Sequence, residues 1–166
     1  MSAEISEAAP YQAIAEALGG DGWCVAPGFG TRDLTVRLRD EAAQLQAAGG
    51  FRPANIGRGT ERHLEPDQRS DLIRWLMPPF MPAQQEYLDK MEQLRLTLNQ
   101  TLFLGLFDYE CHLSIYPPGA RYRKHLDQFQ RDSRRAVSCV LYLNDTWLPK
   151  YGGQLRLYGA NKHEAL

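Results

Sequence analysis

The sequence predicts an α+β fold in which helices come first and an antiparallel, β-rich half follows. Before Phe107, apolar residues recur at steps of three and four, as they do along amphipathic helices. After Phe107 they alternate with polar residues at a period of two, as they do along half-buried strands. No repeat, low-complexity tract or linker divides the 166 residues, so we expect a single domain. It would comprise a mainly helical support region over 1–107, with a loop at 51–70, and the first strands of the sheet over 108–166.

The first helix and the first strand are marked by proline and glycine. Pro10 opens the segment YQAIAEAL (11–18), and the run GGDG that follows ends it. Proline suits the first turn of a helix, and glycine suits the position after its end. The next segment, GWCVAPG (22–28), is apolar and bounded by glycines, which predicts a short strand.

Two longer helices follow. Thr31 can cap a helix over 32–48, because a threonine side chain can accept a hydrogen bond from the first turn. The apolar stripe of this helix consists of Leu34, Leu38, Ala42 and Leu45. A brief apolar segment over 69–79 ends in two prolines, and Pro82 then starts the longest helix, with apolar residues at helical spacing as far as Leu102.

Four segments of the second half have the alternation of strands. They cover residues 109–116, 121–127, 136–145 and 154–158. One face carries Tyr109, Cys111, Leu113 and Ile115 in the first of them, and Val137, Cys139, Leu141 and Leu143 in the third. The edges of a sheet must be paired or covered, and a jelly roll takes about eight strands, so we expect the sheet to be incomplete at its C-terminal end.

Composition narrows the class of function. A net charge of −1 gives no field that would attract nucleic acid, and no window approaches the ~18 apolar residues of a membrane span. The N-terminus lacks the basic start and apolar run of a signal peptide, which predicts a cytoplasmic protein. Cys24, Cys111 and Cys139 form no C-x-x-C pair, so we interpret them as reduced thiols without chemistry, the last two buried.

A candidate metal site lies in the stretch YPPGARYRKHLDQF (116–129). On a strand, His125 and Asp127 would face the same side, so an imidazole and a carboxylate can reach one point. These are two of the three ligands of the 2-His-1-carboxylate triad that holds Fe(II). The same spacing also occurs on exposed strands that bind nothing, so the motif alone leaves both interpretations open.

A longer series of segments resembles the prolyl-4-hydroxylase-like family of Fe(II)- and 2-oxoglutarate-dependent dioxygenases, nearest to its oxygen-sensing branch and small bacterial members. The matching segments, in the family's order, are IGRG, RSDLIRWL, YPPGARYRKHLD, AVSCVLYLND and GGQLRLY, and they cover most of residues 51–158. The resemblance implies a double-stranded β-helix (jelly roll) on N-terminal helices. It also implies hydroxylation of a protein prolyl residue, with 2-oxoglutarate and O₂ consumed to succinate and CO₂, and ascorbate as an accessory reductant. A protein with a target proline, such as a translation factor, would be the partner.

The resemblance also implies roles for individual residues near the metal. His125 and Asp127 would be the first two Fe(II) ligands. Tyr142 matches a tyrosine whose hydroxyl hydrogen-bonds the distal carboxylate of 2-oxoglutarate, and Tyr116 matches one that lines the same pocket. Both tyrosines could instead simply fill space against the strands.

Four residues are implied on the substrate side. Asp71 matches an acidic residue that organises the mouth of the site, and Arg135 a basic residue that meets either that acid or the substrate. Arg58, in the IGRG loop, would touch substrate, and Tyr122 lies beside the metal ligands. Exposed charge pairs stabilise a protein by only ~0–1 kcal/mol, so a purely structural role for the charged residues is an equal alternative.

The third metal ligand is missing from the pattern. The family has a second histidine on a later strand, followed by a basic residue for the 2-oxoglutarate carboxylate, and His163 comes too early to match it. Two ligands bind a metal poorly, so we expect the sequence to be the front part of a longer enzyme. Two alternatives remain: an inactive oxygenase fold that serves as a peptide-binding module, and a zinc-dependent hydrolase or cupin-like protein.

Overall fold

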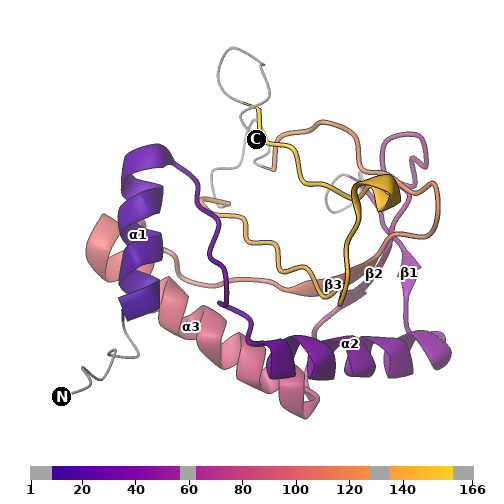
Figure 1. The fold of residues 1–166 in the computed structure, drawn as a ribbon, viewed down its shortest axis with the longest axis horizontal. Helices are drawn as coiled ribbons and strands as arrows, with labels where there is room; N and C mark the ends of the chain where they lie inside the picture. The colour runs from indigo at the N-terminus through magenta and orange to yellow at the C-terminus, as the bar shows by residue number, and fades with distance from the viewer. Residues whose placement is uncertain (1–8, 57–62, 128–134, 159–166) are drawn as a thin grey trace.

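The fold places three helices beside a small antiparallel sheet. The computed structural model describes residues 9–56, 63–127 and 135–158. Its helices are α1 (Ala9–Asp21), α2 (Arg32–Ala47), α3 (Pro82–Leu102) and the short 3₁₀ helix η2 (Pro149–Tyr151), and its strands are β1 (Arg52–Pro53), β2 (Leu72–Trp75) and β3 (His112–Ile115). In Figure 1, α1, α3 and α2 follow the left and lower sides of the molecule, and the sheet stands at the right. Helices and an antiparallel sheet confirm the α+β class.

The first helix is longer than its glycines predict. It runs to Asp21 and ends at Gly22, which has a φ of 77° and donates its N–H to the Leu18 carbonyl over 3.1 Å. Gly19 therefore stays inside the helix. A Cβ atom at Gly19 would come within 2.8 Å of the Leu102 side chain, so this glycine allows α1 to approach the end of α3 closely.

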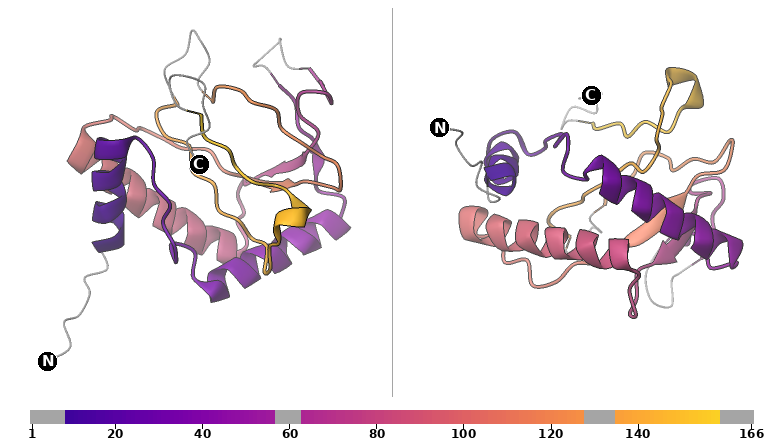
Figure 2. Two further views of the ribbon diagram at one scale, coloured as in Figure 1. Left: turned by 45° about the horizontal axis from the view of Figure 1, so that its top comes forward. Right: turned by 60° about the horizontal axis from the view of Figure 1, so that its bottom comes forward.

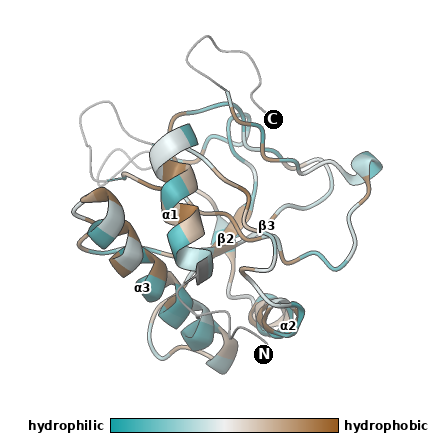
Figure 3. Ribbon diagram, turned by 60° about the vertical axis from the view of Figure 1, so that its left-hand side comes forward, coloured by the Kyte–Doolittle hydropathy of each residue, from teal (hydrophilic) through white to brown (hydrophobic). Residues whose placement is uncertain are grey.

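The α1–α3 contact forms one of two apolar clusters. Ala15, Leu94 and Leu98 are buried there, and Phe29 and Val137 pack against them. Figure 3 shows that hydrophobic and hydrophilic stretches alternate along both helices, as an amphipathic helix with one buried face requires.

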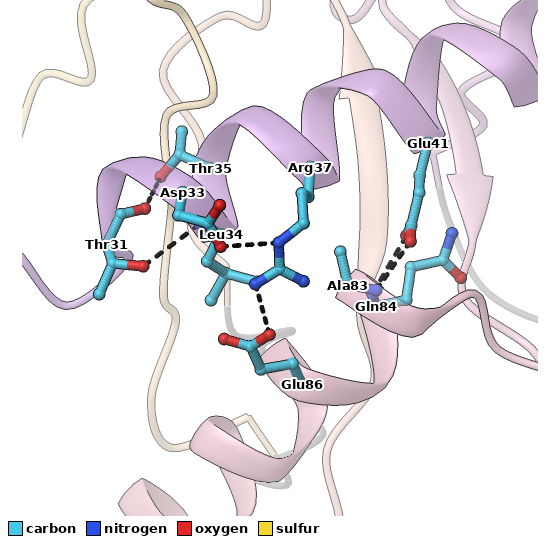
Figure 4. A network of polar contacts seen from close by, with 9 residues as sticks. All are labelled: Thr31, Asp33, Leu34, Thr35, Arg37, Glu41, Ala83, Gln84 and Glu86. Carbon is cyan, nitrogen blue, oxygen red and sulfur yellow. Dashed lines mark hydrogen bonds and ion pairs between the residues drawn. The ribbon is translucent and has the colours of Figure 1, made fainter.

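The second cluster joins α2 to α3 and is reinforced by a buried carboxylate. Thr31 caps α2 as predicted, accepting the Leu34 N–H over 3.2 Å. Glu41 is only 8% exposed, and its two carboxylate oxygens accept the backbone N–H groups of Ala83 (2.7 Å) and Gln84 (3.1 Å) at the start of α3 (Figure 4). A helix leaves its first N–H groups without partners, and its dipole favours a negative charge at this end. Glu41 therefore supplies from α2 the cap that α3 lacks in its own sequence.

A single arginine adds an outer link between the same two helices. Arg37 of α2 donates to Asp33 of its own helix (2.8 Å) and to Glu86 of α3 (2.6 Å) (Figure 4). These side chains are partly exposed, so this link is weaker than the buried cap.

The sheet has the order β1–β2–β3, with all neighbours antiparallel. The central strand β2 comes from the segment that the sequence marked only as apolar, and β1 lies inside the expected loop at 51–70. Leu72 pairs with Ile115, and Trp75 pairs with His112. Leu113 is buried and Cys111 and Ile115 are half-buried, whereas His112, Ser114 and Tyr116 are exposed. The predicted alternation of this segment is confirmed.

The segment 136–145 has the packing of a strand but not its hydrogen bonds. Val137 packs on the first apolar cluster, and Leu141 and Leu143 pack on the second, while the residues between them are exposed. Figure 2 shows the chain in this region extended across the helices. No strand is assigned in the described residues of 136–145, and Cys139 is exposed rather than buried. The apolar alternation therefore predicted the facing of side chains, but a ladder also needs a neighbouring strand.

Two other predicted strands differ in the same way. Residues 23–26 and 154–157 form no strand within the described part of the chain, and 121–127 makes only an isolated bridge, from Tyr122 to Arg69. The sheet of the described residues thus has three strands, and a closed jelly roll is not among its observed features. No helix in this part of the chain is long and apolar enough to cross a bilayer.

The Glu41 cap leads to a stability prediction. Glu41→Gln would replace one accepting oxygen by an amide donor facing a buried N–H, so we expect a loss of about 2 kcal/mol in the free energy of unfolding. Urea denaturation followed by circular dichroism measures it. Glu86→Gln, which removes a partly exposed carboxylate at the same helix contact, should cost less than about 1 kcal/mol. Equal losses for the two variants would show that the buried cap is not the stronger link.

Candidate metal centre

The candidate metal ligands follow a short pairing between two segments that are distant in sequence. Ser70 donates its N–H to the Arg121 carbonyl (3.0 Å), and Arg123 donates its N–H to the Gln68 carbonyl (2.9 Å). The chain reaches this pairing from β3 through a turn in which Gly119 has a φ of 82°, a conformation that favours glycine. The pairing fixes the backbone two residues before His125.

His125 and Asp127 point their donor atoms at each other. The imidazole Nδ1 lies 2.7 Å from the Arg123 carbonyl, and Nε2 lies 2.9 Å from Oδ1 of Asp127. Nδ1 therefore carries the proton donated to the carbonyl, which leaves Nε2 as the ligand atom of a neutral imidazole. Two ligands at right angles, each about 2.1 Å from a metal, are separated by about 3 Å. The pair thus fits two adjacent positions around one divalent cation, as the sequence predicted.

The electrostatics of the pair favour the ligand form of the carboxylate. The hydrogen bond from His125 lowers the pKa of Asp127 to about 2, with a smaller contribution from Ser138. The same hydrogen bond raises the pKa of His125 above its usual value, against the lowering effect of burial. Asp127 is therefore ionised at neutral pH, and a metal must compete with a proton only at Nε2 of His125.

No third ligand stands beside this pair in the described residues. No group of three His, Cys, Asp or Glu side chains that could hold a metal occurs in 9–56, 63–127 or 135–158. His163, the remaining histidine candidate, lies outside the described residues. The site as described supplies one nitrogen and one oxygen.

Behind the ligands lies a buried ion pair. Asp71 is 1% exposed, and its two oxygens accept from Nε (2.7 Å) and the terminal nitrogen (2.9 Å) of Arg69. The Arg69 guanidinium carbon lies 4.5 Å from the centroid of the Tyr122 ring, which stacks on the His125 ring with centroids 3.6 Å apart and an interplanar angle of 12°. A continuous series of contacts therefore runs from Asp71 to the metal ligand.

This pairing corrects one expectation from the sequence. Asp71 binds Arg69, two residues before it, and not Arg135, which donates to Glu110 over 2.8 Å. Full burial also keeps the Asp71 carboxylate from touching a substrate in this conformation. Arg135 contributes to lowering the pKa of Asp127, so it does lie at the site.

The two tyrosines assigned to 2-oxoglutarate lie in different surroundings. Tyr142 donates its hydroxyl to the Gly153 carbonyl (2.8 Å) and accepts the Leu155 N–H (2.9 Å), so it ties the chain after η2 to the segment 136–145. Tyr116 is 48% exposed, interacts electrostatically with Asp71 and Tyr142, and has its pKa raised to about 12, mainly by burial. Tyr116 therefore stands close to the buried ion pair. Arg58 lies outside the described residues.

Sequence reasoning missed Arg69. It stands two residues before Asp71 in RSDLIRWL, so on a strand both would face one side, and this spacing is the signal that could have found it. Glu110, the partner of Arg135, was also missed, although it lies on the polar face of the predicted strand that became β3.

Two comparisons with known proteins bear on this site. Residues 111–166, which include the ligand pair and Tyr142, match the family model of the 2OG-Fe(II) oxygenase superfamily. A crystal structure of a Pseudomonas putida prolyl-4-hydroxylase is similar to this chain, with a TM-score of 0.83 and 44% sequence identity. The match covers 93% of this chain and 78% of that one.

The convergence of Nε2 and Oδ1 leads to a prediction about metal binding. We expect Asp127→Ala to weaken the binding of Mn²⁺ by more than the roughly 10-fold that follows loss of an outer-shell partner, because it removes a ligand. Paramagnetic broadening of NMR signals measures this even when binding is weak. Asp67→Ala removes an exposed carboxylate near the same segment and should leave the affinity unchanged. Equal affinities in the two variants would place any bound metal elsewhere.

Proposed function

Because the chain belongs to the prolyl-4-hydroxylase-like family of Fe(II)- and 2-oxoglutarate-dependent oxygenases, we propose that it takes part in hydroxylating a prolyl residue of a protein substrate. The observation that carries the proposal is the pair His125–Asp127, whose donor atoms converge at 2.9 Å within the matched residues. Fe(II), with 2-oxoglutarate, would supply the oxidising power for the C–H bond, O₂ being consumed and succinate and CO₂ formed. Ascorbate would serve as the accessory reductant.

The chain's own residues would hold the metal in a defined orientation. His125 presents Nε2 because its other nitrogen is bound to the Arg123 carbonyl. Asp127 supplies an ionised oxygen, because its pKa is about 2. A third ligand from residues that the structure does not describe would complete the triad, with the remaining metal positions open. The extended segments 121–127, 136–145 and 154–158 would be the strands of the jelly roll around this site.

Tyr142 and Tyr116 would face the cosubstrate. A hydroxyl has a single proton, and that of Tyr142 is donated to the Gly153 carbonyl in this structure. Tyr142 would therefore have to release this carbonyl to donate to a carboxylate of 2-oxoglutarate. The raised pKa of Tyr116, about 12, keeps its hydroxyl protonated and able to donate at neutral pH.

The substrate would approach on the side of Arg135. Its guanidinium is 40% exposed and bound to Glu110, so it can exchange this partner for a group on a peptide at little cost. Tyr122 lies beside it at the ligands, and Arg58 would contribute from the IGRG loop. Asp71 would act from behind, by holding Arg69.

One observation favours the alternative of a peptide-binding module. The described residues contain two metal ligands and no third. A fold with this site could still hold a peptide at Arg135 and Tyr122 without oxidising it. Turnover of 2-oxoglutarate separates the two functions, since only the enzyme forms succinate.

The test of the enzyme is coupled turnover. With Fe(II), 2-oxoglutarate and a proline-containing peptide, the protein at the full length of its reading frame should form succinate and a peptide that has gained one oxygen atom. Asp127→Ala should abolish both products, and Asp67→Ala should leave both intact. Peptide binding without succinate, in the presence of bound metal, would favour the binding module instead.

The position of Tyr142 leads to a second prediction. If its hydroxyl binds the cosubstrate carboxylate, Tyr142→Phe should raise the KM for 2-oxoglutarate about 10-fold, because a hydrogen bond to a charged group contributes at least about 1.5 kcal/mol. The matched control is Tyr151→Phe, which removes the hydroxyl of an exposed tyrosine in η2. A lower Tm with an unchanged KM would show that Tyr142 serves only to tie Gly153 and Leu155.

A further inference from the structure

The most unusual feature near the metal ligands is a fully buried carboxylate that makes no contact with them. The Asp71 side chain is 0% exposed and that of Arg69 is 14% exposed, and two parallel hydrogen bonds of 2.7 and 2.9 Å join them. A buried ion pair of this kind contributes little net stability relative to apolar residues of the same volume. Stability is therefore a weak reason for its presence at this place.

The geometry indicates what the pair does instead. Bidentate hydrogen bonding fixes both the position and the plane of the guanidinium. The Arg69 guanidinium lies 4.5 Å from the centroid of the Tyr122 ring, within the range of a cation–π contact. Backbone pairing of 68–70 with 121–123 holds the two residues opposite each other, so the contact does not depend on either side chain alone.

The last contact reaches the metal ligand. Tyr122 and His125 stack with ring centroids 3.6 Å apart and planes at 12°. The His125 side chain is 30% exposed, and its hydrogen bond to the Arg123 carbonyl fixes one point of the ring. A ring held at one point can still rotate about that bond, whereas stacking on a fixed neighbour also sets its plane.

We propose that Arg69 is a positioning residue for the metal centre: held by Asp71, it fixes the Tyr122 ring, which in turn sets the plane of the His125 imidazole so that Nε2 faces the metal. This inference rests on the proposed function, because it concerns the same metal site. It gives Asp71 and Tyr122 a part in orienting a ligand, in addition to any contact that Tyr122 makes with substrate.

The first test compares arginine variants. Arg69→Gln should weaken Mn²⁺ binding about 10-fold, the usual effect of losing an outer-shell partner, and Arg69→Lys should recover only part of it, because lysine keeps the charge and loses the planar fork. Arg121→Gln is the matched control: it removes a neighbouring arginine whose contact with Asp67 is exposed, and should leave the affinity within twofold. Affinity within twofold for Arg69→Gln as well would overturn the proposal.

A second pair of variants leaves the buried ion pair intact, so it remains informative if Arg69→Gln does not fold. Tyr122→Phe preserves the stacked ring and should keep most of the Mn²⁺ affinity, whereas Tyr122→Leu removes the ring and should lose as much as Arg69→Gln. If Tyr122→Leu binds Mn²⁺ as well as Tyr122→Phe, the ring does not orient the ligand and the proposal is wrong.

A readout without metal separates this inference from the proposed function. In the metal-free protein, nuclear Overhauser effects between the ring protons of Tyr122 and His125 should be present, and they should be lost or weakened in Arg69→Gln but not in Arg121→Gln. Retention of these effects in Arg69→Gln would refute the positioning role. Failure of the unmodified protein to bind Mn²⁺, with the ring contacts and their dependence on Arg69 intact, would count against the metal function alone.

Discussion

The fold depends on a carboxylate from one helix capping the start of another. Glu41 of α2 satisfies two N–H groups of α3 in a buried position, and this cap fixes where the longest helix begins relative to its neighbour. The two helices then offer one apolar surface, on which Leu141 and Leu143 rest. Without that surface the segment 136–145, which is not assigned as a strand among the described residues, would have little to hold it. A polar contact therefore determines where an apolar surface forms.

A second buried carboxylate has a comparable part at the metal centre. Asp71 and Glu41 are both buried, and each binds donors that come from the backbone or from an arginine on the same side of the molecule's interior. The exposed pairs of this protein, such as Arg32 with Asp145 at 3.9 Å, are long and solvated by comparison. Water screens such pairs, so they fix little geometry. Position in this fold is set by the few charges that water does not reach.

The sequence predicted the helices well and the sheet only in part, for a physical reason. The starts of α2 and α3 follow from Thr31 and Pro82, which act on their own first turns. Gly19 did not end α1, because its role is contact with Leu102, more than 80 residues away in the chain. The ligand pair was accessible because i and i+2 share a face, whereas the stacking of Arg69, Tyr122 and His125 joins two segments that no local pattern connects. Side-chain facing is a local property of the chain, and pairing between segments is not.

The segment 136–145 joins order in its side chains to open main-chain groups. Val137, Leu141 and Leu143 are anchored in the two apolar clusters, yet the described residues give this stretch no ladder of backbone bonds. Amide hydrogens are protected from exchange with solvent by such bonds, not by the packing of a neighbouring methyl group. The stretch would therefore keep a fixed conformation while its amides exchange quickly, and α2 and α3, against which it packs, would exchange slowly. Rapid deuterium uptake here would be a sign of unpaired backbone rather than of a loose chain.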